Sequence, residues 1–386
     1  MPLETDPERE IEALAAVLSS IPYVAIYLIG SAARGELAQG IIGGRRELFS
    51  DYEFFVVTPR FISHRERDRV RELLDATARS FGYRNPLFHA DFTTREANRL
   101  PSMRHTVFTF ELRENGRLIA GHDMRHRIPA VTLETLDRRD TREILLKRLR
   151  AVAHGLPSPF ILGRGARLDA MTEAVAGYLV ARNALDLTTV FVPEAGALLP
   201  TYHRRVEWWR SHASAEPLNR FGPGAIEFLE TCLIERRDLR FSEPARERYP
   251  RWVELMEIAL GAVGLDGDAH GSPFAERPLS RGQWWAWARN ALRVARDAGP
   301  TAAPRWIRMP RKAMEAKGLL LAHRALAAWI RGAETEALGF LEGSWRLLSE
   351  LSCGQTAAEM GGSFAERWLA LRLGWRSYWE RWVRLI

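Results

Sequence analysis

Three acidic side chains stand inside short apolar segments in the N-terminal third of the chain. Asp51 and Glu53 fall within SDYEFFVV, and Asp91 falls within LFHADF, 40 positions after Asp51. Because side chains alternate across a β-strand, Asp51 and Glu53 are expected to project from one face. Adjacent carboxylates repel each other unless a cation lies between them, and all-oxygen ligands favour Mg²⁺ or Mn²⁺. The pattern indicates a divalent-metal site; the alternatives are a solvated strand face for the pair and a salt-bridged aspartate for Asp91.

A glycine–serine pair follows the first apolar stretch of the chain. Residues 23–29 are typical of a buried strand, Gly30 and Ser31 end it, and AARGEL then favours a helix. Glycine allows the backbone to approach a phosphate closely, and the N–H groups at a helix start favour an anion. Gly-Ser after a strand is common, so the pair is informative only together with the acids. His89, on the same strand face as Asp91, either contacts the site or has a structural role.

Helices and short strands are expected to position these residues. Periodic apolar residues predict helices over 6–20 and 63–81. Short apolar runs predict strands over the following ranges: 23–29, 52–57, 87–92, 107–112 and 117–120. The last two strands flank Asn115 and Gly116, which is a strong hairpin signal. Residues 39–46 are expected to form a glycine-rich loop.

The character of the sequence changes after Pro129. Residues 1–130 hold 18 arginines and 18 acidic residues, so the remainder carries the whole net charge of +7, and all 13 tryptophans lie at or beyond Trp208. Helical patterns recur over the following ranges: 138–154, 166–187, 200–213, 223–237, 243–263, 280–297, 311–331, 334–351 and 363–385.

These observations predict an α+β chain of two domains. Residues 1–130 are expected to form a short mixed sheet flanked by helices. Residues 131–386 are expected to form a mostly α-helical domain, which a break near residues 264–280 would divide further.

The N-terminal motifs together resemble those of the DNA polymerase β superfamily of nucleotidyltransferases. GSAARGE is similar to the GS-x-x-R-G form of many small bacterial members, and SDYE matches the Asp-x-Glu variant of kanamycin-type aminoglycoside nucleotidyltransferases. Asp91 stands where the family has a third acid on a later strand. The resemblance covers residues 10–125. Ser31 and Asp51 are 20 positions apart, which is longer than usual for the family, and the additional residues fall in AQGIIGGRREL.

The resemblance implies in-line attack of an acceptor hydroxyl on the α-phosphorus of a nucleoside triphosphate, with ATP favoured and pyrophosphate leaving. Asp51 and Glu53 would hold two Mg²⁺ or Mn²⁺ ions, and Asp91 would ligate the ion beside the attacking hydroxyl. The other candidates are Gly30, Ser31, Arg34 and Ser50 for nucleotide binding, and Arg45, Arg46 and His89 for phosphate or acceptor contact. Arg34 would either neutralise phosphates or form a surface ion pair, and Arg45 and Arg46 are otherwise solvated.

The predicted helical domain carries an unusually basic segment. Residues 277–312 hold eight arginines and Lys312 against the single acid Asp297, a net charge of +8. On a helix over 280–297, one face around Trp285 holds Arg281, Arg289, Arg293 and Arg296. This face either binds a phosphate, base or acidic glycan or is a solvated basic surface. The apolar seam of the last helix, from Phe364 to Leu385, indicates core packing first, a homodimer interface second and membrane-surface attachment third.

Composition also limits the location and function of the protein. No apolar run approaches the ~20 residues needed to span a bilayer, and the acidic N-terminus is unlike a signal peptide, so we expect a cytoplasmic protein. The favoured activity is transfer of a nucleoside monophosphate to a hydroxyl of a small molecule. The alternatives are modification of a macromolecule, by RNA end addition or protein AMPylation, and a non-catalytic nucleotide-binding regulatory or antitoxin module. Nucleic acid is the less favoured partner because no RNA-binding motif is visible.

Overall fold

The chain folds into two compact units in the computed structural model. The structure describes residues 6–163, 167–264, 311–352 and 362–380, with the single residues 292 and 296. The first unit contains residues 1–141 and 185–242, and the second contains residues 142–184 and 243–386. The first unit therefore holds the expected N-terminal domain together with a later stretch of helices. The further break expected near residues 264–280 falls almost wholly outside the described residues.

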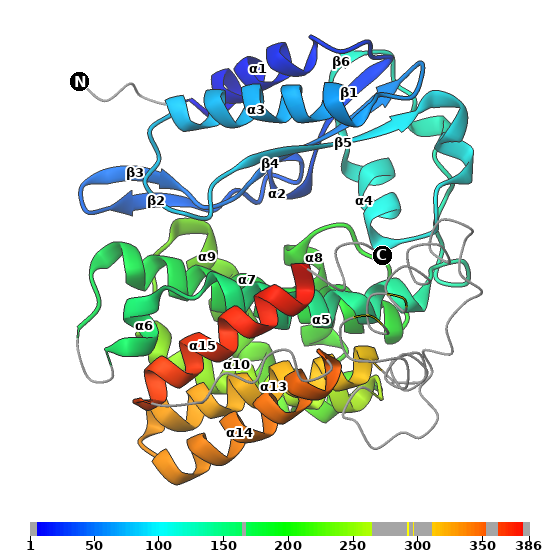
Figure 1. Ribbon diagram of the computed structural model, residues 1–386. Coiled ribbons are helices and arrows are strands. Elements are labelled where there is room, and N and C mark those ends of the chain that lie inside the picture. The colour runs from blue at the N-terminus through cyan, green and yellow to red at the C-terminus, as the bar shows by residue number, and fades with distance from the viewer. Residues whose placement is uncertain are drawn as a thin grey trace. The chain divides into compact units, whose positions relative to one another are not determined.

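A four-stranded mixed sheet forms the centre of the first unit (Figure 1). Its strands are β1 (Ala25–Ile29), β4 (Tyr52–Thr58), β5 (Ala90–Glu96) and β6 (Arg117–Gly121), in the order β5-β4-β1-β6. β1 runs antiparallel to both of its neighbours, and β4 runs parallel to β5. The two central strands, β1 and β4, are almost entirely buried, which explains their continuous apolar sequence. The predicted mixed sheet is confirmed, although the third strand begins at Ala90 and not at residue 87.

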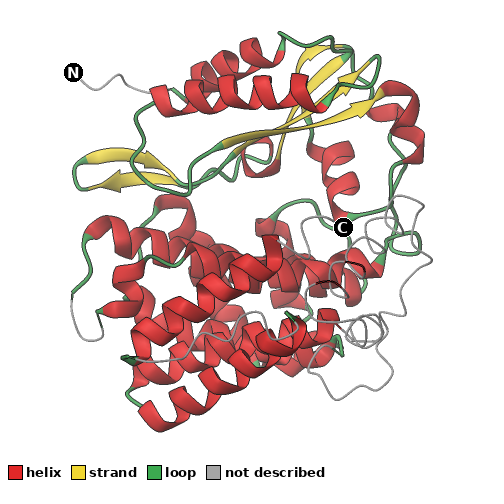
Figure 2. Ribbon diagram, viewed as in Figure 1, coloured by secondary structure: helices red, strands yellow, loops and turns green. Residues whose placement is uncertain are grey.

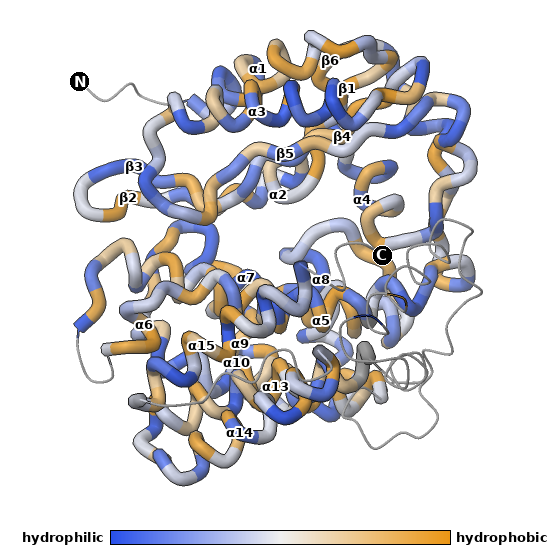
Figure 3. The backbone as a smooth tube through the Cα atoms, in the orientation of Figure 1, coloured by the Kyte–Doolittle hydropathy of each residue, from blue (hydrophilic) through white to orange (hydrophobic). Residues whose placement is uncertain are grey.

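Helices α1 (Pro7–Leu18) and α3 (His64–Ser80) cover one face of this sheet (Figure 1). The side chain of Asp6 caps α1, and Ser63 and Glu66 form a capping box at the start of α3. Both helices combine hydrophobic and hydrophilic residues (Figure 3). Their apolar sides meet the inward side chains of the strands in one core, which includes Leu14, Leu28, Phe54, Leu74 and Phe92. Both predicted helices are confirmed.

The opposite face of the sheet is covered by α4 (Val107–Asn115) and two 3₁₀ turns, η1 (Ala97–Ser102) and η2 (Arg125–Arg127). The prediction of a strand over residues 107–112 is wrong. Thr106 caps the segment as a helix, because its hydroxyl accepts the backbone N–H of Thr109 at 3.2 Å. Gly116 donates its N–H to the carbonyl of Leu112 at 2.9 Å and ends the helix. The Asn-Gly signal therefore marks a helix end, and local capping outweighs the β-propensity of VFTF.

The glycine-rich stretch between the first two sheet strands is an ordered hairpin. β2 (Gln39–Ile42) pairs antiparallel with β3 (Arg45–Leu48), and Ile42 faces Arg45. The two turn residues, Gly43 and Gly44, have φ values of +59° and +75°, the left-handed conformation that a two-residue type I′ turn requires. The expected loop over residues 39–46 is therefore a second, two-stranded sheet.

Helices from residues 185–242 complete the first unit. They are the end of α7 (Ala170–Glu194), α8 (Tyr202–Ser211), the 3₁₀ turn η3 (Leu218–Phe221) and α9 (Pro223–Asp238). Phe191, Trp209 and Phe221 form a small aromatic core among them, with ring centroids 4.8–6.5 Å apart. Edge-to-face aromatic contacts of this kind fix the helices against one another.

The described part of the second unit is helical, as predicted (Figure 2). Besides most of α5 (Arg138–Gly155) and α7, its helices are α6 (Ser158–Leu162), α10 (Ala245–Ala262), α13 (Arg311–Arg331), α14 (Glu334–Leu351) and α15 (Phe364–Tyr378). The apolar seam of α15 is buried from Phe364 to Tyr378, which confirms core packing for that part. The basic segment 277–312 lies almost entirely outside the described residues.

Within the described residues, one helix has the length and composition of a membrane span. It is α7, whose most apolar 18-residue window is 94% buried inside the structure. Such burial is typical of the central helix of a folded protein.

Candidate active site

The three predicted acids lie at one end of two adjacent strands. Asp51 directly precedes β4, Glu53 is the second residue of β4, and Asp91 is the second residue of β5. Glu53 and Asp91 are in register in the parallel pair, so their side chains leave the same face of the sheet. Alternation along β4 gives Asp51 the same direction. The strand arrangement therefore brings together the three positions that the sequence predicted.

Gly30 lies directly against Glu53. Ile29, the last residue of β1, is in register with Glu53, and Gly30 follows it with a φ of +67°. A Cβ atom on Gly30 would stand 2.2 Å from Glu53 Oε2, well inside van der Waals contact. The backbone conformation favours glycine here, and a Cβ atom would force the Glu53 carboxylate or the helix start to shift. The start of the short helix α2 (Gly30–Ala33), which includes Ser31, therefore adjoins one of the acids.

Two of the acids have cationic or titratable neighbours. His89 Nδ1 lies 3.3 Å from Asp51 Oδ1, and the Asp51 side chain is only 10% exposed. Arg71, on α3, reaches Asp91 Oδ1 with its Nη2 at 3.3 Å. The Asp91 side chain is half exposed, because β5 is an edge strand. His89 thus contacts the site as the sequence suggested, whereas Arg71 was not anticipated, since nothing in its helix pattern distinguishes it from other surface arginines.

The donor set fits a hard divalent cation in its chemistry, because carboxylate oxygens are the ligands that Mg²⁺ and Mn²⁺ prefer. Among the described residues, however, no group of three or more His, Cys, Asp or Glu side chains is arranged to hold an ion. Asp91 turns its Oδ1 toward Arg71 and toward the backbone N–H of Phe92, at 2.8 Å. A cation that used all three acids would compete with Arg71 for Asp91.

Arg34 and Ser50 bond to neighbouring groups of the protein, and their assignment to nucleotide binding stays a prediction. Ser50 is only 1% exposed, and its hydroxyl accepts a hydrogen bond from the backbone N–H of Ala38 at 2.8 Å. The Arg34 side chain is 7% exposed and forms ion pairs with Glu36 and Glu111. Ser50 thus holds the backbone of Ala38, and Arg34 is held by two carboxylates.

Arg45 and Arg46 lie at the start of β3, in the hairpin. The Arg45 guanidinium is 3.5 Å from the carbonyl of Gly82, just after α3, and Arg46 donates to the Gln39 side chain at 2.7 Å. Neither contact involves the three acids. The assignment of Arg45 and Arg46 to phosphate or acceptor contact stays a prediction.

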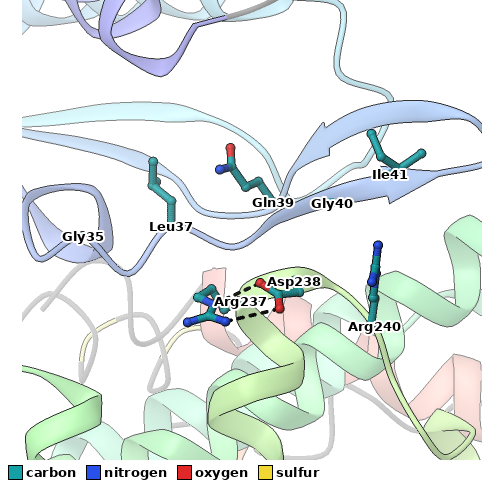
Figure 4. A pocket seen from close by; sticks show the side chains of 8 residues that line it. All are labelled: Gly35, Leu37, Gln39, Gly40, Ile41, Arg237, Asp238 and Arg240. Atoms are coloured by element: carbon teal, nitrogen blue, oxygen red, sulfur yellow. Dashed lines mark hydrogen bonds and ion pairs between the residues drawn. The ribbon is translucent and has the colours of Figure 1, made fainter.

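Two of the cavities formed by described residues lie in the first unit, near the segment that follows α2. One, of about 630 Å³, lies between the start of β2 and the end of α9, where Arg237, Asp238 and Arg240 face Gln39 and Ile41 (Figure 4). The other, of about 400 Å³, is lined by residues of α8 and α9 together with Gly35 and Glu36. Neither is lined by Asp51, Glu53 or Asp91. Gly30 and Ser31 do not line them either, so these two cavities do not coincide with the candidate active site.

Comparisons with known proteins give little further guidance. No model of a known protein family matches the chain, and no curated protein matches it in sequence. Among solved structures, the chain is similar to a spectinomycin adenyltransferase from Enterococcus faecialis, determined with ATP and spectinomycin, at 12% identity and a TM-score of 0.28. That similarity covers 59% of this chain and 99% of the other. So low a TM-score does not establish a shared fold.

Proposed function

We propose that the first unit is a metal-dependent nucleotidyltransferase, which transfers a nucleoside monophosphate from a nucleoside triphosphate to a hydroxyl group of a small molecule. The observation that carries the proposal is the placement of Glu53. It stands in register with Asp91 on one side and directly against Gly30 on the other, with Asp51 two residues before it. Three carboxylates beside a glycine-led helix start are an arrangement suited to a triphosphate and its counter-ions.

In this proposal, each group of site residues has a separate role. Asp51 and Glu53 hold Mg²⁺ or Mn²⁺, which would offset the charge of the phosphates when bound. Gly30 and Ser31 bind the β- and γ-phosphates through the backbone at the start of α2. Asp91 accepts the proton of the acceptor hydroxyl. The acceptor oxygen forms a bond to the α-phosphorus, the bond from that phosphorus to the bridging oxygen breaks, and pyrophosphate leaves.

Nucleotide binding and transfer can be tested separately. Calorimetry with ATP, CTP, GTP and UTP, each with and without Mg²⁺, is expected to give at least one metal-dependent affinity, with ATP favoured. Incubation with α-labelled nucleotide, Mg²⁺ and hydroxyl-bearing acceptors, followed by mass spectrometry, would identify the adduct. Absence of binding by all four nucleotides would rule the proposal out.

Replacing Asp91 with asparagine is expected to suppress transfer far more than nucleotide affinity. Asparagine keeps the shape of the side chain but cannot accept a proton, so the loss falls on the transition state. We expect turnover to fall about 100-fold or more, the usual contribution of a general base, with the nucleotide Kd changed only slightly. Steady-state kinetics and calorimetry on the same preparation would measure both quantities.

The control for Asp91→Asn is Glu72→Gln, which removes an exposed acid from α3 beside Arg71. It should behave like the wild type in both assays. Near-normal turnover by Asp91→Asn would assign Asp91 to its ion pair with Arg71 and place the base elsewhere.

A further inference from the structure

Arg34 ends the short helix that Gly30 and Ser31 begin, and its side chain is almost completely buried. Its Nε donates to Glu36 Oε2 at 2.8 Å, and its Nη1 donates to Glu111 Oε2 at 2.7 Å. Burial lowers the pKa of Arg34, but the neighbouring Glu111 and Glu36 carboxylates raise it more, so this pKa lies above its ordinary value. Arg34 is therefore a charged group held by two carboxylates, and it fixes the end of α2.

Glu111, on α4, holds a second buried arginine with its other oxygen. Arg205 Nη2 donates to Glu111 Oε1 at 2.5 Å, and the Arg205 side chain is only 3% exposed. The remaining nitrogens of Arg205 are also used: Nε donates to the Leu199 carbonyl and Nη1 to the Thr189 hydroxyl, each at 2.7 Å. Arg205 is thus fixed in α8, and Glu111 bridges it to Arg34.

An aromatic ring organises the same group of charges. The guanidinium carbons of Arg34, Arg205 and Arg236 lie 5.4, 5.8 and 5.5 Å from the ring centroid of Tyr202. The Tyr202 hydroxyl donates to Asp186 Oδ1 at 2.7 Å. We call this group the arginine cluster; its members are Arg34, Glu36, Glu111, Asp186, Tyr202, Arg205 and Arg236. Three arginines and three acids balance one another.

We propose that Glu111 is a positioning residue of the nucleotide site, which holds the Gly30–Ser31 turn in place by joining Arg34 to Arg205. The inference rests on the proposed function, because it concerns the turn to which the phosphates are assigned. Glu111 itself is bonded to two arginines and contacts no reacting atom. Glu111 acts on the turn through α2, the four-residue helix that begins at Gly30 and is followed by Arg34.

Any shift of the Gly30–Ser31 turn would change its contact with Glu53. Gly30 lies so close to Glu53 that even a Cβ atom has no room between them. A displacement of Arg34 would carry α2 with it and change the spacing between the phosphate-binding backbone and the metal-binding carboxylate. Neutralising Glu111 would leave Arg34 Nη1 and Arg205 Nη2 facing an uncharged amide, which weakens the connection between Arg34 and the fixed Arg205.

The test uses Glu111→Gln and Arg205→Lys in the full chain. Glutamine keeps the shape of Glu111 without its charge, and lysine keeps the charge of Arg205 without its forked geometry. We expect the Kd and KM for Mg²⁺-ATP to rise about tenfold or more, while turnover at saturating ATP and the KM for the acceptor stay near wild-type values. Hydrogen exchange of the backbone amides of residues 30–36 should accelerate, with β1 and β4 unchanged.

Glu114→Gln is the matched control, because Glu114 is an exposed acid on the same helix. It should leave nucleotide affinity and exchange unchanged. If Glu111→Gln does not fold, Arg205→Lys carries the test. If the variants unfold at lower temperature yet bind nucleotide like the wild type, the arginine cluster has only a stabilising role. That result would overturn this inference but not the proposed function. A wild-type protein that binds no nucleotide would overturn the proposed function as well.

Discussion

Replacing Glu53 with glutamine is expected to reduce nucleotidyl transfer about 100- to 1,000-fold, the size seen when one preorganised charge-stabilising group is lost. Glu53 stands between Asp91 on β5 and Gly30 at the end of β1. Losing its charge would weaken the hold on Mg²⁺ and leave the phosphate charge poorly compensated. Steady-state transfer rates at several Mg²⁺ concentrations would measure the effect, and excess Mg²⁺ should recover part of the lost rate.

Glu12→Gln provides the control for Glu53, because it neutralises an exposed acid on α1 in the same unit. The control should transfer nucleotide like the wild type. Circular dichroism would check the folding of Glu53→Gln. We expect folding to be retained, because glutamine has nearly the same shape as glutamate. Wild-type rates from a folded Glu53→Gln protein would remove Glu53 from the site and with it the main support for the proposed reaction.

Replacing Gly30 with alanine is expected to abolish Mg²⁺-dependent nucleotide binding. The new methyl group would stand 2.2 Å from Glu53 Oε2, and the residue would also have to keep a φ of +67°. The left-handed conformation alone costs a non-glycine residue about 1–2 kcal/mol. Relief of the contact requires either the carboxylate or the helix start to move, so the spacing between the two proposed ligand groups changes. Calorimetry with Mg²⁺-ATP would measure the loss.

Gly44→Ala separates the two causes of that effect. Gly44 has a φ of +75°, but a Cβ atom there would meet no other atom within 4 Å. This control therefore has the backbone strain without the steric contact. We expect it to lose some thermal stability and retain nucleotide affinity. Equal losses of affinity in both variants would mean that strain, and not the contact with Glu53, explains the result for Gly30.

The placement of the acids was predictable because it depends on short-range rules. Alternation fixes the relation of Asp51 to Glu53, and an apolar run with one acid predicts a strand over 87–92 around Asp91, although β5 begins only at Ala90. Their exact pairing was not predictable, since the register of Glu53 with Asp91 depends on how β4 and β5 meet. The turn of Asp91 toward Arg71 depends on a side chain 20 positions away along the chain.

The contacts of Arg34 could not be predicted from the residues next to it in the sequence. GSAARGE places Arg34 next to the Gly30–Ser31 pair that is proposed to bind phosphate, and only the fold shows that Glu36 and Glu111 form ion pairs with it. Glu111 itself was hidden because residues 107–112 have the composition of a strand, while the Thr106 cap makes them helical. A single cap of about 1 kcal/mol can decide a segment of balanced propensity.

The order of the first unit along the chain has a consequence for its synthesis. Residues 1–141 leave the ribosome before residues 185–242, which belong to the same unit. At about 5–20 residues per second, the roughly 100 intervening and completing residues take about 5–20 s to appear. During that interval Glu111 can pair with Arg34 but has no Arg205. A nascent chain or gene fragment that stops at residue 141 would thus carry all three acids on an unfinished support, and we expect nucleotide affinity to reach its full value only after α8 has been made.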